Sequence, residues 1–186
     1  MRTLLLAGIL ICLFGCHFDG PFIESGKGLK GLIPPGKYTF QETPVKEGRN
    51  AEPVTVTNDG DQYLLDCKGD VVAVRIMDIN GVHVAEVTDG NHDKKKDIVL
   101  VYLFQKTDVG HAFIPIDSDK WQKLLFGMKD KWKLATDKSP KILKDAPEKY
   151  VVSGDQKDKE SVIKDVIVNH RDVFSADKGI EFKKVE

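Results

Sequence analysis

The sequence predicts a mainly β domain of the α+β class, an antiparallel meander or small barrel-like sheet with one or two short C-terminal helices. Two observations carry this prediction. Short runs of alternating apolar residues, joined by local turns, recur from Gly36 to Ile116. From Asp117 onward the apolar residues change to helical spacing. The 186-residue chain is long enough for one sizeable domain and hardly two.

About seven strands are expected at short intervals, as in a small barrel or a curled sheet. In chain order their segments read KYTFQET, EPVTVTN, QYLLDC, VVAVRIMDI, VHVAEVT, IVLVYLFQ and HAFIPI. Asp59-Gly60 is typical of a hairpin turn, and Asn80-Gly81 is the strongest short hairpin signal in the chain. The run from Ile98 to Phe104 is apolar at every position, so both faces of that strand should be covered.

The helical spacing after Asp117 predicts a short amphipathic helix that plugs one end of the sheet. Its apolar residues fall at i, i+3, i+4 and i+7, and Asp117 or Ser118 is a suitable N-cap. These apolar residues are Trp121, Leu124, Leu125 and Met128. A second helix is predicted from Ser161 to His170, although its β-branched residues are poor helix formers. KYVVSG before it and IEFKKV after it indicate two more strands.

The N-terminus carries a short basic and apolar signal. Arg2 is followed by an apolar run of about twelve residues, which is shorter than the ~20 residues that cross a bilayer as a helix. The run ends in Leu13-Phe14-Gly15-Cys16, which resembles the lipobox of bacterial lipoproteins. The resemblance implies a signal peptide over residues 1–15, cleavage between Gly15 and Cys16, and an S-diacylglycerol and N-acyl (palmitate) modification of Cys16. An ordinary signal peptide with an incidental Cys16 and an uncleaved anchor are the alternatives.

The anchor resemblance sets an expected domain organisation. Residues 16–35 are rich in Gly and Pro and are predicted to form a flexible tether with an r.m.s. reach of roughly 25 Å. Residues 36–186 are then a single β-rich domain, with its helical elements and terminal strand in residues 116–186. His17 occupies the position where Asp favours inner-membrane retention in enteric bacteria. The resemblance therefore implies an outer-membrane location, facing the periplasm, in preference to the inner membrane.

A second resemblance covers most of the chain from Tyr38. The segments YLFQK, GHAFIPID and KW, followed by a late helix, Phe174 and EFKKV, are similar to a loose group of small β-rich envelope lipoproteins. The resemblance implies the same architecture and anchoring. The group has no assigned activity, so it implies no mechanism.

The net charge argues against nucleic-acid binding, and the cysteine positions argue against an intramolecular disulfide. The formal net charge is −1, so the chain lacks the strongly basic face of a nucleic-acid-binding protein. Of the three cysteines, Cys12 lies in the signal peptide and Cys16 would be acylated, which leaves Cys67 without an intramolecular partner. We expect Cys67 to be a small buried hydrophobe, with a reactive or intermolecular thiol as the alternative.

Candidate metal and catalytic sites are weak. The stretch from Asp89 to Leu100 begins like an EF-hand loop, but it lacks the glycine and the bidentate glutamate of that loop. The histidines show no metal-binding spacing, and only the fold could bring His83 and His111 together. No motif of a catalytic serine or cysteine is present. We therefore expect no metal, no cofactor and no enzyme activity. The other histidines of the predicted domain are His92 and His170. The lysines that could contact lipid head groups are Lys94 to Lys96, Lys129, Lys131 and Lys133.

These observations favour a lipid-anchored envelope lipoprotein that acts as a non-catalytic binding or structural module. Its partners would be membrane lipid, through Cys16, and another envelope component. The alternatives are a lipocalin-like carrier of a small apolar ligand, with the meander closed around a cavity, and a periplasmic enzyme. Large aliphatic residues that fill the inner face of the sheet would argue against the carrier.

Overall fold

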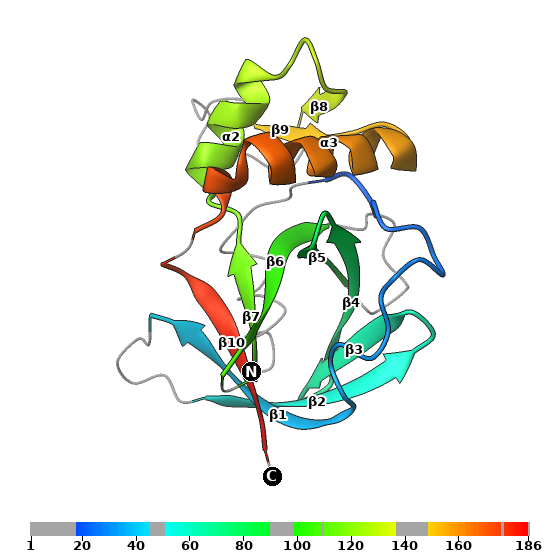
Figure 1. Cartoon of the computed structure of the whole chain (residues 1–186), viewed down its shortest axis with the longest axis vertical. Helices are drawn as coiled ribbons and strands as arrows, with labels where there is room; N and C mark the ends of the chain where they lie inside the picture. Colours follow the sequence, from blue (N-terminus) through cyan, green and yellow to red (C-terminus); the bar gives the residue numbers. More distant parts are fainter. Residues whose placement is uncertain are drawn as a thin grey trace.

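The computed structural model describes residues 18–44, 51–89, 99–108, 110–136, 149–175 and 177–185. Within them, eight strands form a closed antiparallel barrel in the order β1-β10-β7-β6-β5-β4-β3-β2 (Figure 1). The strands are β1 (Gly36–Thr43), β2 (Glu52–Asp59), β3 (Gln62–Cys67), β4 (Asp70–Ile79), β5 (Val82–Asp89), β6 (Leu100–Thr107), β7 (Gly110–Pro115) and β10 (Gly179–Lys184). The predicted fold class is confirmed, and the meander closes into a barrel because β10 pairs with both β1 and β7.

The turns form where the sequence predicts them. Asn80 and Gly81 have φ values of 54° and 79°, the left-handed conformation of a two-residue hairpin turn. This turn fixes the register of β4 and β5, in which Ile79 pairs with Val82. Gly60, with a φ of 62°, serves the same purpose between β2 and β3.

A layer of helices and a small sheet is inserted between β7 and β10. This helical layer lies against the barrel in Figure 1. It consists of α2 (Ser118–Gly127), β8 (Leu134–Thr136), β9 (Tyr150–Val152), α3 (Gln156–Asn169) and the 3-10 turn η1 (Arg171–Val173). Asp117 caps α2, as predicted. The second helix starts five residues before the predicted Ser161, because Asp155 and Asp158 form a capping box there.

The structure has an inner apolar core inside the barrel and an outer apolar core between the barrel and the helical layer. Together they explain the sequence pattern of β6. Leu100, Tyr102 and Phe104 point into the barrel, whereas Val101 and Leu103 point outward and are buried under the helical layer. The prediction that both faces of this strand are covered is therefore confirmed. The predicted role of the first helix as a plug of the sheet's end is wrong, because Trp121 and Leu125 belong to the outer core.

The N-terminal segment, residues 18–35, is part of the folded domain. Phe18, Phe22 and Ile23 are buried in the outer core and Ile33 in the inner core, each at most 2% exposed. Figure 1 shows this segment, in blue, running from beside α3 along the outside of the barrel to β1. The predicted flexible tether over residues 16–35 is therefore wrong for residues 18–35, and the domain starts by Phe18 instead of Gly36.

The glycines of this segment allow close packing. A Cβ atom on Gly28 would lie 2.2 Å from the backbone oxygen of Asp61, a distance that no side chain can adopt. From composition alone, such glycines predict a flexible chain. Here Gly28 instead permits close contact between the segment and the turn before β3.

Candidate functional site

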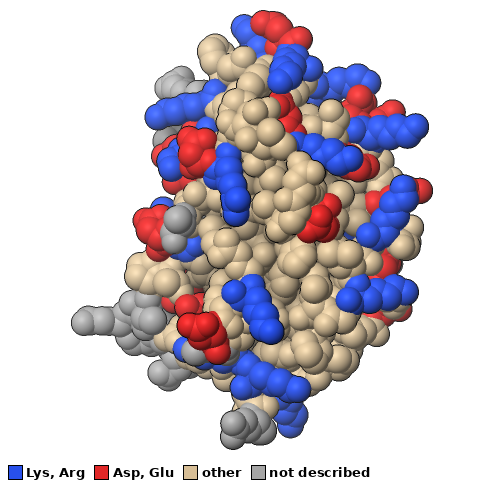
Figure 2. Space-filling view, in the orientation of Figure 1, with Lys and Arg blue, Asp and Glu red and all other residues tan. Residues whose placement is uncertain are grey.

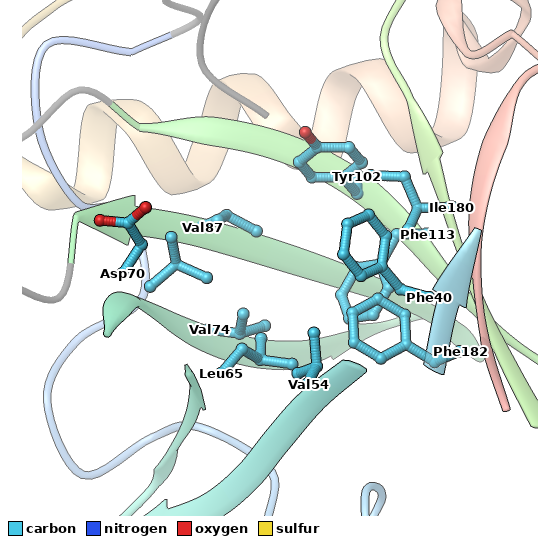
Figure 3. A pocket seen from close by; sticks show the side chains of 11 residues that line it. Phe40, Val54, Leu65, Asp70, Val74, Val87, Tyr102, Phe113, Ile180 and Phe182 are labelled. Atoms are coloured by element: carbon cyan, nitrogen blue, oxygen red, sulfur yellow. The ribbon is translucent and has the colours of Figure 1, made fainter. Parts of the chain in front are cut away.

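The inside of the barrel contains a small apolar pocket (Figure 3). One wall is aromatic, with the Phe113 ring 5.2 Å from Phe182 and 6.0 Å from Tyr102 in tilted or edge-to-face contact. Aliphatic side chains such as Val74 and Val87 form the opposite wall, and Asp70 lies at the edge. The lining residues come from the ends of β3 and β5 and the starts of β2, β4 and β10, which we call the pocket end of the barrel.

The cavity volume is about 20 Å³. A single water molecule needs roughly 10–15 Å³ by this measure, whereas sites for small organic ligands have volumes of about 300–1,000 Å³. Side chains therefore fill most of the barrel interior, as expected for a barrel of eight strands. The pocket accommodates a group the size of a water molecule or a methyl.

The opposite end of the barrel is closed by residues 29–34, which we call the plug. The Tyr63 hydroxyl donates a hydrogen bond to the Leu29 carbonyl (2.8 Å) and accepts one from the Leu32 N–H (2.9 Å). The Tyr38 hydroxyl donates to the Pro34 carbonyl (2.7 Å), and Ile33 is buried among the inner core residues. The plug, and not a helix, fills this end.

A cluster of charged residues lies under the N-terminal segment on the outer face of the barrel. Glu86, which is 1% exposed, accepts hydrogen bonds from the N–H groups of Phe22 (2.6 Å) and Ile23 (2.9 Å). Asp61 accepts two more, at 2.8 and 2.9 Å, from the segment's glycines 26 and 28. Arg75 lies between the carboxylates, 3.4 Å from Glu86 and 3.8 Å from Asp61.

The two carboxyl groups of this cluster differ in their pKa values. Burial raises the pKa of Glu86, although the N–H groups of the segment and Arg75 act in the opposite direction. For Asp61, burial alone would also raise the pKa, but the backbone N–H groups and Arg75 outweigh it and lower the pKa. A buried carboxyl with a raised pKa is a candidate acid or base. Here, however, both oxygens of Glu86 are occupied by donors from the protein, so the group fastens the N-terminal segment to the barrel.

Sequence reasoning missed this cluster, although a signal was present. A two-residue turn at Asn80-Gly81 places residues opposite each other in pairs, and it puts Arg75 opposite Glu86. Arg75 is the one charged residue from Val71 to Met77, and Glu86 is the one charged residue from Val84 to Val87. The hairpin register alone would thus have predicted the ion pair, but not the backbone groups of Phe22 and Ile23 that complete it.

The fold places two of the scattered histidines beside the same aromatic ring. His83 and His111 lie on either strand next to Phe104, with ring centroids 6.3 Å and 5.2 Å from its ring. Burial lowers the pKa of His111. His170 contacts Trp132, with the ring centroids 6.2 Å apart. Among the residues that the structure describes, no group of three or more His, Cys, Asp or Glu side chains is arranged to hold a metal ion.

The remaining predicted residues fall into two groups. Gly15, Cys16, His92, Lys94 to Lys96 and most of the Asp89–Leu100 stretch lie outside the described residues. Cys67 is free and 4% exposed, which confirms its buried position, and burial raises the pKa of its thiol. No helix in the described ranges is both long enough and apolar enough to span a membrane.

The three candidate lysines after α2 have local contacts. Lys131 pairs with Asp165 and Lys133 with Asp158, both at 2.7 Å, while Lys129 lies over the Phe126 ring. Figure 2 shows basic and acidic side chains interspersed over one face of the molecule, around a central area with few charges. This arrangement is that of a solvated surface and not of a basic patch.

No protein family, no curated protein and no solved structure matches the chain.

Proposed function

We propose that this protein is a lipid-anchored envelope lipoprotein whose barrel domain acts as a non-catalytic binding or structural module. The observation that supports a non-catalytic role is the set of hydrogen bonds that Glu86 accepts. Buried titratable groups usually mark chemistry, but this one is occupied by the N–H groups of Phe22 and Ile23 and by Arg75. The buried charge therefore supports the fold.

The pocket supports the same conclusion. Asp70 and Tyr102 are the two residues of its lining whose side chains carry polar atoms. Burial raises the pKa of Tyr102, so its hydroxyl stays neutral at physiological pH. Acyl transfer or hydrolysis needs a nucleophile next to a base within a site that fits the substrate. The described lining offers neither that pair nor sufficient volume.

The anchor part of the proposal rests on Leu13 to Cys16 and has a direct test. Cys16→Ser should leave an unprocessed precursor that incorporates no labelled palmitate in a bacterial host. Cys67→Ala is the matched control and should be processed and labelled normally, because Cys67 is buried inside the domain. Normal processing and labelling of Cys16→Ser would overturn the anchor. Density-gradient separation of the two membranes then tests the proposed outer-membrane location.

The binding role is tested by cross-linking in cells followed by purification of the lipidated protein. We expect a specific envelope protein or lipid to be recovered with the wild-type domain. Absence of such a partner, together with a hydrolase activity of the purified protein, would contradict the proposal and favour the periplasmic enzyme.

A carrier of a small apolar ligand is the second candidate, because the pocket is lined almost wholly by apolar side chains. A cavity of about 20 Å³ would have to expand more than tenfold to take a typical ligand. Titration with a fluorescent fatty acid decides between the two. Under the first proposal no saturable binding is expected, whereas one-to-one binding that Val72→Phe abolishes would favour the carrier.

A further inference from the structure

The start of the folded domain is fixed at Phe18. Its side chain is 0% exposed, and its ring lies 5.2 Å from Phe22 and 6.1 Å from Trp121. Its backbone forms bridges with Val99 and Val152, and the next N–H, of Asp19, donates to the Val152 carbonyl at 3.0 Å. Phe18 therefore joins the barrel to the small sheet of the helical layer.

This position limits the distance between the domain and a lipid anchor. Two residues of extended chain span at most about 7 Å, so the Cα atom of Cys16 lies within that distance of the Cα atom of Phe18. A tether through residue 35 would instead have given a reach of roughly 25 Å. The segment that could have supplied the longer reach is packed against the barrel, with Ile23 and Ile33 buried.

From this geometry we infer, given the lipidation of Cys16 proposed above, that the domain lies directly on the bilayer surface with its pocket end toward the lipid. Of the described residues, the face around Phe18 includes Asp19, Ser153, Gly154 and the first turn of α3. Phe18 bridges Val99, the residue before β6. β6 begins with Leu100 opposite Val87, and Val87 lines the pocket.

The charges on this face allow such contact with anionic lipid. Lys159 pairs with Asp19 at 2.8 Å and Lys133 with Asp158 at 2.7 Å. Asp155 and Lys157 add one further acidic and one further basic side chain. Among the described residues named here, acidic and basic side chains are equal in number, so together they carry no net negative charge that would repel a phosphatidylglycerol surface. The anchor supplies the affinity, and the face only has to be compatible with the lipid.

The far side of the domain is defined by β6. This strand runs from Leu100 to Thr107, so about seven residue steps of 3.3 Å place its two ends roughly 23 Å apart. Asp108, exposed in the turn after β6, therefore lies at the plugged end, whereas Ser153 follows Val152 next to Phe18. These two positions provide a near probe and a far probe.

The experiment uses lipidated, full-length protein in vesicles of phosphatidylethanolamine and phosphatidylglycerol that contain a spin-labelled lipid. A fluorescent label is attached at Ser153→Cys or Asp108→Cys, each in a Cys67→Ala background. We expect quenching to be several-fold stronger at position 153 than at position 108. Insertion of twenty Gly and Ser residues between His17 and Phe18 should remove most of this difference, because the domain can then leave the surface.

The outcomes separate the two proposals. Protein that does not float with the vesicles overturns the anchor and, with it, this inference. Protein that floats but shows equal quenching at both positions, or quenching that the inserted spacer leaves unchanged, overturns the surface orientation alone. The circular dichroism spectrum of each variant confirms that the barrel is folded before the comparison.

Discussion

Glu86→Ala tests whether the buried carboxylate holds the N-terminal segment on the barrel. The substitution removes the acceptor for two buried backbone N–H groups, those of Phe22 and Ile23. It also removes the nearer of the two carboxylates that pair with Arg75 and leaves only Asp61, at 3.8 Å. Breaking a buried ion pair on one side costs about 3–5 kcal/mol. A domain of this size is stable by about 5–15 kcal/mol, so the variant should lose a large part of its free energy of unfolding.

The assay is urea unfolding followed by tryptophan fluorescence. Trp121 is a suitable reporter because Phe18, at the start of the segment, packs on it. Hydrogen exchange of the Phe22 and Ile23 amides measures the local effect, and both amides should exchange faster in Glu86→Ala. Glu86→Gln keeps the shape and one acceptor oxygen, so its loss should be smaller, about 1–3 kcal/mol.

Glu52→Ala is the matched control. Glu52 also forms an ion pair, with Lys68 at 2.7 Å, but both side chains are exposed. An exposed pair contributes about 0–1 kcal/mol, so this variant should unfold almost as the wild type does. If Glu86→Ala costs as little as Glu52→Ala, or if the two amides exchange at the wild-type rate, the structural role given to Glu86 is wrong.

Three further measurements address other elements. Gly81→Ala should lower the free energy of unfolding by about 1–2 kcal/mol because the φ of Gly81 is 79°. Its control is Gly127→Ala at the C-terminal end of α2, where a Cβ atom would meet no neighbour within 4 Å; this variant should leave the free energy of unfolding unchanged or raise it slightly. Asp117→Ala should cost about 1 kcal/mol and Asp117→Asn far less, since Asn also caps helices. The hydrogen bonds from the α2 backbone lower the pKa of Asp117, so the unfolded chain binds its proton more readily; the stability it contributes should be lost as the pH falls below 3.8, and Asp117→Asn should reduce that loss in acid unfolding curves. In a protein with both Cys12→Ser and Cys16→Ser, Cys67 is the remaining thiol; it should react with a thiol reagent only after denaturant is added, and rapid reaction of the native protein would contradict its burial.

Local signals in the sequence were sufficient for the strands and most turns. The Asn80-Gly81 turn and the continuous apolar run before Phe104 each predict a feature that the structure contains. These features depend on residues that are close in the sequence, or on one strand's own pattern. That is why they could be derived without the fold.

The N-terminal segment could not be predicted in the same way. Gly26 and Gly28 look like linker residues, and their use becomes visible only beside Asp61, more than thirty positions away. The same is true of Phe22 beside Glu86. The pocket is a third case, because whether large side chains leave a cavity depends on how eight strands close, which no single strand determines.

The pairing of β1 with β10 has a consequence for the way the barrel is made. Phe40 lies opposite Phe182, so the first and last strands meet across almost the whole domain sequence. During synthesis, every chain that has not reached β10 lacks the strand that closes the barrel. Until then β1 and β7 each have an unpaired edge that can associate with other chains. Such distant pairing slows folding and exposes intermediates to aggregation. We expect this domain to depend on a holding chaperone until its last residues emerge, and a chain cut before β10 to aggregate instead of forming a smaller sheet.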